Sequence, residues 1–228
     1  MSKELSRHGD TIPNTYIDPG AETQEAYEIS QKSRMLARQM VGNASPEDRI
    51  RQRCSVAVGD FSMAGLMRFC NDPVPAALAA LRTGVLVITD IRMVQVGIQK
   101  KGHECKVICA LDYGSEIAIE RDITRSSAGF LALRDRLAGS IVVIGNAPSA
   151  LLTLCDLVQE GIRPAVIIGT PVGFVNAAES KEVLRTLRIP SITTEGTRGG
   201  TPVAVAAINE CITMHIEESG NAGSGHRV

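Results

Sequence analysis

Short runs of β-branched apolar residues recur along the second half of the chain and predict its strands. Such runs, without alternating polar positions, are typical of strands buried on both faces of a sheet. They occupy residues 85–88, 107–108, 141–144 and 165–168, and a last short strand fits 191–194. Helical patterns lie between or after them at 127–137, 150–159, 177–187 and 203–215. This alternation predicts an α/β fold, a doubly wound parallel sheet with helices on both faces.

The first third of the chain is predicted to be mostly helical. Good helix formers with a partial apolar stripe predict a helix over 22–40. Ser45 then has the character of an N-cap, followed by Pro46 and two acidic residues, which predicts the start of a second helix. A short helix is predicted around 78–81.

Both ends of the chain are polar and are expected to lie outside the core. Residues 1–20 contain two prolines and predict an extended N-terminal arm, either free or wrapped on a partner subunit. Residues 219–228, rich in small and polar residues, predict a disordered tail. The residues between these ends, 21–218, are predicted to form a single domain.

Composition excludes several classes of partner. The 228 residues carry 24 Lys and Arg against 25 Asp and Glu, a net charge of −1, so no overall field attracts a nucleic acid or an anionic membrane. Three tyrosines, four phenylalanines and no tryptophan leave few platforms on which bases could stack. We therefore expect no nucleic-acid partner.

Targeting and metal signals are also missing from the sequence. No apolar run approaches the length of a membrane span, and the first residues lack the apolar stretch of a signal peptide. We expect a cytoplasmic protein without membrane contact. The six cysteines are scattered, with no Cys-x-x-Cys or Cys/His cluster at zinc spacing, so we expect buried free thiols and no metal site.

The segments that follow the predicted strands carry the candidate chemistry, because open α/β sheets bind ligands at the carboxyl ends of their strands. Glycines there let a ligand approach the backbone, and arginines bind carboxylates or phosphates through two donors at once. These features together favour a small polyanionic ligand. The candidate binding residues are Arg92, Thr124, Arg125, Ser126, Gly145, Asn146, Pro171, Val172, Gly173, Phe174, Arg198, Gly199 and Gly200.

Structural explanations compete with this interpretation. The Gly145-Asn146-Ala147-Pro148 segment has equal claim to be a tight turn before a helix, and each arginine taken alone could pair with an acid of the chain. There is no phosphate-binding loop, no Gly-x-Gly-x-x-Gly after a strand and no Gly-x-Ser-x-Gly. The residues by themselves thus predict an anion-binding domain without an evident general acid or base.

Two segments give the chain a family resemblance. Residues 145–151 (Gly-Asn-Ala-Pro-Ser-Ala-Leu) and 171–181 (Pro-Val-Gly-Phe-Val-Asn-Ala-Ala-Glu-Ser-Lys) closely resemble the precorrin-8X methylmutases of corrin biosynthesis. Three further segments follow the family in the same order: residues 90–94, 124–126 and 198–201. The resemblance extends from about Asp18 to about Asn209.

The resemblance implies a flavodoxin-like sheet, a homodimer with its cleft near the subunit interface, and no metal or organic cofactor. It implies an isomerase that moves a methyl group from C-11 to C-12 of precorrin-8X or cobalt-precorrin-8. That tetrapyrrole carries many acetate and propionate side chains, so the family and the strand-end arginines point to the same anionic ligand.

At one position the chain departs from the family. The family has a histidine in an Arg-x-x-His-x-x-Gly-Asp setting, thought to protonate the macrocycle, and the matching run Arg53–Asp60 has Val56 there. Since valine transfers no proton, no catalytic residue is assigned. Three hypotheses follow: a methylmutase that uses shape, electrostatics or another acid such as His103 or Asp60; a non-catalytic corrinoid-binding homologue; or an enzyme for a different modified tetrapyrrole.

Overall fold

The computed structural model describes residues 23–224, and the side chains among them up to 220. The predicted arm at 1–20 lies outside the described residues. The elements, in chain order, are α1 (Gln24–Val41), α2 (Pro46–Val58), α3 (Met63–Leu66), β1 (Met67–Cys70), α4 (Pro73–Arg82), β2 (Val87–Thr89), α5 (Arg92–Gly97), β3 (Val107–Cys109), η1 (Ala110–Asp112), α6 (Ser115–Arg121), α7 (Arg125–Ala132), η2 (Arg134–Arg136), β4 (Ile141–Ile144), α8 (Pro148–Gln159), β5 (Val166–Gly169), α9 (Ala177–Thr186), β6 (Ser191–Thr194) and α10 (Thr201–Ser224).

The strands form one sheet in the order β1-β6-β5-β4-β2-β3. The last five run parallel to one another, and counted along the chain they follow the flavodoxin order 2-1-3-4-5, which confirms the predicted fold class. The edge strand β1 pairs antiparallel with β6 and was not predicted. Its four residues, Met-Arg-Phe-Cys, are too short and too polar to stand out as a buried strand.

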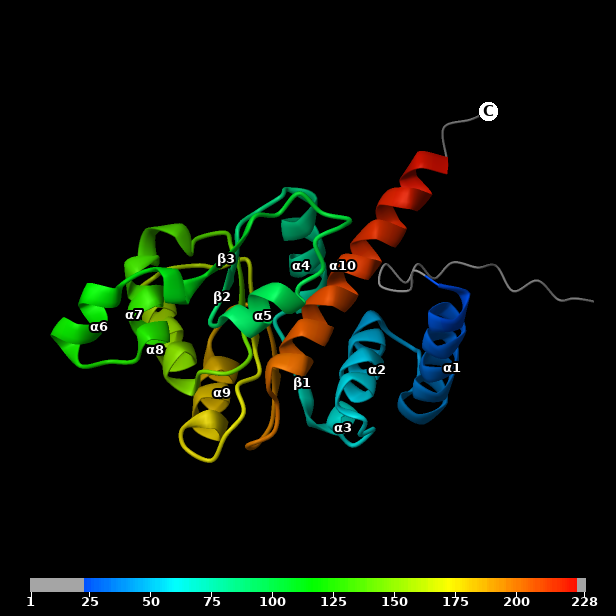
Figure 1. Ribbon diagram of the computed structural model, residues 1–228, viewed down its shortest axis with the longest axis horizontal. Coiled ribbons are helices and arrows are strands. Elements are labelled where there is room, and N and C mark those ends of the chain that lie inside the picture. The colour runs from blue at the N-terminus through cyan, green and yellow to red at the C-terminus, as the bar shows by residue number, and fades with distance from the viewer. Residues whose placement is uncertain (1–22, 225–228) are drawn as a thin grey trace, which may run out of the picture.

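Two apolar cores cover the two faces of the sheet. Alternate residues of the central strands, such as Val143 and Ile168, pack with α2, α4, α5 and α10. Their neighbours, such as Val142 and Ile167, pack with α7, α8 and α9. Figure 1 shows these layers, with α10 crossing one side of the molecule, α2 beside it and α1 outermost. The predicted helices on both faces are therefore confirmed.

Helix boundaries follow the local signals closely in α2 and less closely in α10. The Ser45 hydroxyl caps α2 by accepting from the Asp48 N–H, and the Asp48 carboxylate accepts from the Ser45 N–H. By contrast, α10 continues to Ser224, so residues 219–224, expected in the disordered tail, are helical. Gly220 and Gly223 discourage a helix by propensity alone, whereas the preceding apolar face of α10 is held by packing on α2 and α4.

Candidate functional site

The switch point of the sheet, where a ligand is expected, lies between β2 and β4. Asp90 follows β2 and is completely buried there. Its carboxylate accepts from the backbone N–H groups of Gly145 at 3.2 Å, Asn146 at 2.8 Å and Ala147 at 2.9 Å. Burial raises the pKa of Asp90, and these three bonds oppose the rise. The N–H groups that could have received an anion after β4 are therefore already occupied by a side chain of the protein.

Replacing Asp90 with asparagine is expected to loosen this loop. One carboxylate oxygen becomes an NH₂ group that faces backbone N–H donors, so at least one buried donor loses its acceptor. The expected loss in free energy of unfolding is about 2 kcal/mol, measured by urea denaturation. An unchanged stability in Asp90→Asn would show that the three bonds contribute nothing net.

Arg92 and Arg125 converge on η1, at one end of the carboxyl edge. Arg92 forms an ion pair with Asp112, and Arg125 donates to the Leu111 carbonyl at 3.2 Å. Thr124 caps α7 and its hydroxyl also lies 2.9 Å from that of Ser149, at the start of α8. Both guanidinium groups are exposed and have donors left over, so they remain available to an anion.

Arg198 lies at the other end of the edge, beyond β6. Its guanidinium binds Asp60 and, at 3.0 Å, the Ser62 hydroxyl. The loop that carries it is tied to the loop after β5, because the Gly200 N–H donates to the Thr170 carbonyl at 2.7 Å. A Cβ on Gly199, whose φ is +159°, would lie 2.3 Å from that same oxygen, so only glycine fits.

A buried lysine on α9 is hydrogen-bonded to the backbone of the Arg198 loop. Lys181 on α9 is completely buried, and its Nζ donates to the Thr194 hydroxyl at 3.1 Å and to the Arg198 carbonyl at 2.8 Å. No ion pair joins Lys181 to an acid within the described residues. Sequence reasoning included Lys181 only as part of a family motif; its burial could not be seen there.

Lys181 is expected to give the folded protein a stability that increases with pH. Burial, with a smaller effect of Arg185, lowers the pKa of Lys181 from 10.5 to about 8. Between these values the unfolded chain holds a proton that the folded chain has released, so this group's contribution to the free energy of unfolding rises with pH. Other groups titrate too, so the measured quantity is the difference in urea stability between the wild type and Lys181→Met across this window. An exposed control, Lys101→Met, should track the wild type, and a constant difference for Lys181→Met would contradict the prediction.

The thirteen predicted binding residues therefore occupy three places along one edge of the sheet rather than one cluster. Gly145 and Asn146 lie at its centre, and the Arg92 and Arg198 groups lie on either side. Three strand spacings of about 4.8 Å separate β2 from β6, about 14 Å in all. The members at the Arg92 end are Arg92, Thr124, Arg125 and Ser126, and those at the Arg198 end are Pro171, Val172, Gly173, Phe174, Arg198, Gly199 and Gly200.

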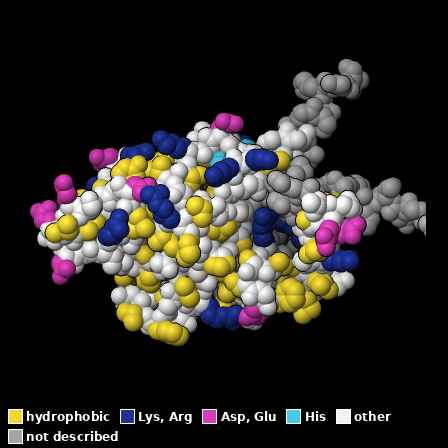
Figure 2. All heavy atoms as spheres, in the orientation of Figure 1, with side chains coloured by type: hydrophobic (Ala, Val, Ile, Leu, Met, Phe, Trp, Pro, Cys, Tyr) yellow, Lys and Arg dark blue, Asp and Glu magenta, His cyan; other side chains and the backbone are white. Residues whose placement is uncertain are grey.

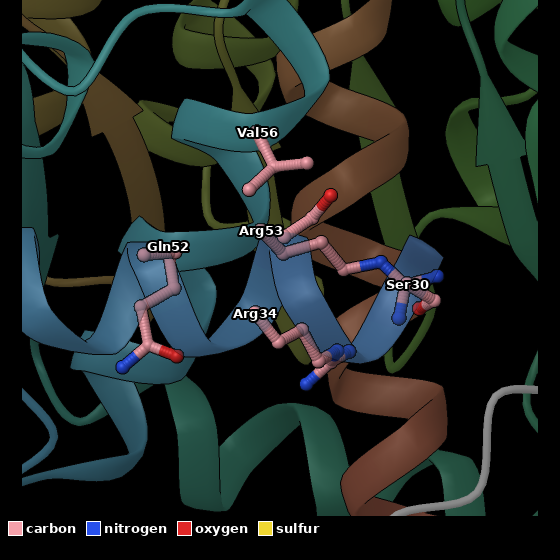
Figure 3. Close-up of a pocket in the computed structure, with 7 residues that line it drawn as sticks. Ser30, Arg34, Gln52, Arg53 and Val56 are labelled. Atoms are coloured by element: carbon pink, nitrogen blue, oxygen red, sulfur yellow. The ribbon is translucent and has the colours of Figure 1, made fainter. Parts of the chain in front are cut away.

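Val56 lies on α2, four residues before Asp60, and is 41% exposed. It borders a cavity between α1 and α2 and a groove between α2 and α10. Figure 3 shows the Arg53 side chain extending from α2 toward Ser30 on α1, with Val56 one turn farther along α2. Position 56 thus opens onto unfilled space, four residues before Asp60, which forms the ion pair with Arg198.

Neither of the alternative acids has the environment of a proton donor. Both ring nitrogens of His103 are engaged, with the Gln99 carbonyl at 2.6 Å and the Cys105 N–H at 3.1 Å. Hydrogen bonds from Ser62, with Arg198 beside them, hold the pKa of Asp60 below its usual range, so it is a carboxylate at neutral pH. The structure therefore does not support the interpretation that either residue replaces the family histidine.

Apolar side chains are exposed along the carboxyl edge. Met93 and Val96 on α5 and Phe174 and Val175 in the loop after β5 are each more than half exposed, Phe174 to 94%. Figure 2 shows hydrophobic side chains spread over the middle of one face of the molecule, with Lys and Arg side chains among them. Such a mixture suits a broad ligand with an apolar body and an acidic rim.

The part of the chain that the structure describes contains neither a metal-binding cluster nor a membrane-spanning helix. No group of three or more His, Cys, Asp or Glu side chains is placed to hold a metal ion. Over the same residues no helix is long and apolar enough to cross a membrane.

The comparisons with known proteins agree on one family. The family model for precorrin-8X methylmutase matches residues 28–214. A cobalt-precorrin-8 methylmutase of Methanothermobacter thermautotrophicus is 40% identical over 201 residues, which cover 86% of this chain and 96% of that one. The cobalamin biosynthesis protein CbiHC of Archaeoglobus fulgidus is 37% identical over 87% of this chain, which spans only 42% of that longer protein.

A solved structure agrees. The precorrin-8X methylmutase of Thermus thermophilus superposes with a TM-score of 0.78 at 32% identity, over 85% of this chain and 98% of that one. The residues that the family model matches, 28–214, include all six strands and the loops at the carboxyl edge. This chain belongs to the precorrin-8X methylmutase family.

Proposed function

We propose that this protein is an isomerase of corrin biosynthesis that moves a methyl group from C-11 to C-12 of precorrin-8X or cobalt-precorrin-8. Family membership carries this proposal. The carboxyl edge supports it, because the strands that precede Arg92 and Arg198 lie about 14 Å apart on either side of a glycine-containing centre. A macrocycle with acidic side chains could engage both ends while its apolar body contacts the exposed aliphatic residues.

The chemistry at position 56 favours a second candidate function. Val56 transfers no proton, and His103 and Asp60 are engaged elsewhere. A homologue that binds a corrinoid without catalysing the migration, or one that acts on a different modified tetrapyrrole, would need the same anion-binding loops and no acid at this place.

The visible absorption spectrum distinguishes these functions. Purified full-length protein is mixed with precorrin-8X and, separately, with its cobalt form, and the spectrum is followed in time. Conversion to the spectrum of the migrated product supports the isomerase. Tight binding without conversion would replace it with the binding protein, and no binding of either compound would favour a different tetrapyrrole.

The predicted homodimer and cytoplasmic location remain part of the proposal. Exposed Met93, Val96, Phe174 and Val175 would be covered if a second subunit closed over the carboxyl edge. Light scattering should then give twice the mass of the chain, and Phe174→Asp should shift the protein toward monomer. A monomeric wild type at the concentrations of the activity assay would contradict the dimer.

A further inference from the structure

A ring of three hydrogen bonds holds the main chain of Arg198 from inside the protein. The Lys181 ammonium donates to the Arg198 carbonyl at 2.8 Å and to the Thr194 hydroxyl at 3.1 Å. That hydroxyl donates in turn to the same carbonyl at 2.7 Å. Lys181 and Thr194 are both completely buried, whereas Arg198 is exposed. A buried helix residue and a buried strand residue therefore hold one carbonyl of an exposed loop.

The loop that carries Arg198 has little rigidity of its own. Three of the five residues 196–200 are glycine, which loses more backbone freedom on ordering than any other residue. Two backbone hydrogen bonds join this segment to another loop, the one after β5. Lys181 on α9 and Thr194 on β6 join it to regular secondary structure, so they restrict the positions that its backbone can take.

The side chain of Arg198 is held at its other end as well. Its guanidinium forms the ion pair with Asp60 and donates through Nη1 to the Ser62 hydroxyl at 3.0 Å. Within the described residues its Nε has no acceptor, and the side chain is 47% exposed. An acidic ligand thus meets a guanidinium that is fixed at both ends, which reduces the entropy lost on binding.

Packing alone does not explain a lysine at position 181. A buried ammonium without a carboxylate partner is costly to the fold, and no acid pairs with Lys181 in the part of the chain that the structure describes. Burial, with a smaller effect of Arg185, lowers its pKa to about 8. Buried groups of this kind gather at functional sites, and the bonds of Lys181 lead to Arg198.

We propose that Lys181 and Thr194 are positioning residues, which fix the Arg198 carbonyl so that the guanidinium is placed to bind one carboxylate of an acidic ligand. The inference rests on the proposed function, in which that carboxylate is an acetate or propionate side chain of the tetrapyrrole. Both residues are completely buried, so they act through Arg198 and do not touch the ligand.

Binding of hydrogenobyrinic acid, the cobalt-free product of the proposed reaction, tests the inference. Thr194→Val keeps the side-chain volume and removes the hydroxyl, so the Kd should rise about 10-fold. Lys181→Met should raise the Kd at least as much. Thr194→Ser restores the hydroxyl and should bind as the wild type does. An unchanged Kd in Thr194→Val, or no rescue by serine, would overturn the proposal.

The matched control is Thr193→Val. The Thr193 hydroxyl is equally buried on the same strand, but it donates to the Gly169 carbonyl of β5 and not to the Arg198 loop. Thr193→Val should therefore leave the Kd unchanged. A rise equal to that of Thr194→Val would assign the effect to general loosening of the strand and contradict the proposal.

A double-mutant cycle shows whether the effect passes through Arg198. Arg198→Met should itself weaken binding of hydrogenobyrinic acid. In that background Thr194→Val should change the Kd by less than about 2-fold, because the guanidinium that it positions is gone. Additive effects of the two substitutions would mean that Thr194 acts elsewhere, and the positioning role would fail.

Amide hydrogen exchange separates this inference from the proposed function, because it needs no ligand. In Thr194→Val and Lys181→Met, peptides that cover residues 195–200 should exchange faster than in the wild type, and those of β4 and α8 should not. If the wild type does not bind hydrogenobyrinic acid, the proposed function fails, and this exchange then decides whether the loop is held. Unchanged exchange at 195–200 would overturn the inference even where the corrinoid binds.

Discussion

Replacing Val56 with histidine is expected to increase the rate of methyl migration by about 10²- to 10⁴-fold, the usual contribution of a general acid. The position accepts an imidazole because it is partly exposed and borders unfilled space on two sides. Arg53, which lines the same cavity, would favour the neutral ring, which makes the protonated form a stronger acid. The rate is measured from the change in visible absorption of precorrin-8X or its cobalt form.

Val56→Asn is the control for this variant, because it adds a polar side chain that does not transfer a proton at neutral pH. It should bind the substrate as the wild type does and leave the rate unchanged. If Val56→His binds substrate normally but gains no rate, a missing acid does not limit this protein. An equal gain in Val56→Asn would assign the effect to polarity instead.

Replacing Glu210 with glutamine is expected to cost about 3–5 kcal/mol of unfolding free energy, the usual effect of removing one partner from a buried ion pair. Glu210 is completely buried and binds the guanidinium groups of Arg34, Arg49 and Arg53. Glutamine keeps the shape and removes the charge, so the three guanidinium groups lose the carboxylate that they share. Urea denaturation with a two-state analysis measures the loss.

The control is Glu218→Gln on the same helix. Glu218 binds Arg82 at 2.6 Å, but both side chains are about half exposed, and such surface pairs contribute less than about 1 kcal/mol. Losses of similar size in the two variants would mean that burial does not set the strength of the Glu210 cluster. A loss confined to Glu210→Gln would also show that α1, α2 and α10 depend on it for their packing.

Local signals account for most of the predicted elements. The apolar runs at 141–144 and 165–168 correspond closely to β4 (Ile141–Ile144) and β5 (Val166–Gly169), because a strand buried on both faces has few alternatives. The Ser45 capping signals located the start of α2 to the residue. Strand β1 was missed because its pairing with β6 joins segments more than a hundred residues apart.

The candidate site was only partly predictable. Placing the strand-end loops at one edge followed from parallel topology, so Arg92, Arg125 and Arg198 were correctly expected at that edge; their binding of a ligand stays a prediction. The sequence did not reveal the hydrogen-bond partners of those loops. The Asp90 carboxylate accepts from N–H groups that lie 55 to 57 residues later in the chain. Lys181 donates to the Arg198 carbonyl, which lies 17 residues later.

By itself, the sequence determined the fold class, the edge that carries the loops and the valine at position 56, and it predicted an anionic ligand. These follow from periodicity, residue type and position in the chain. Only the tertiary structure decided which donors remain free, because that depends on side chains brought together by packing. It left the N–H groups after β4 satisfied by Asp90, and it placed Arg53, one of the three arginines bound to Glu210, beside Val56.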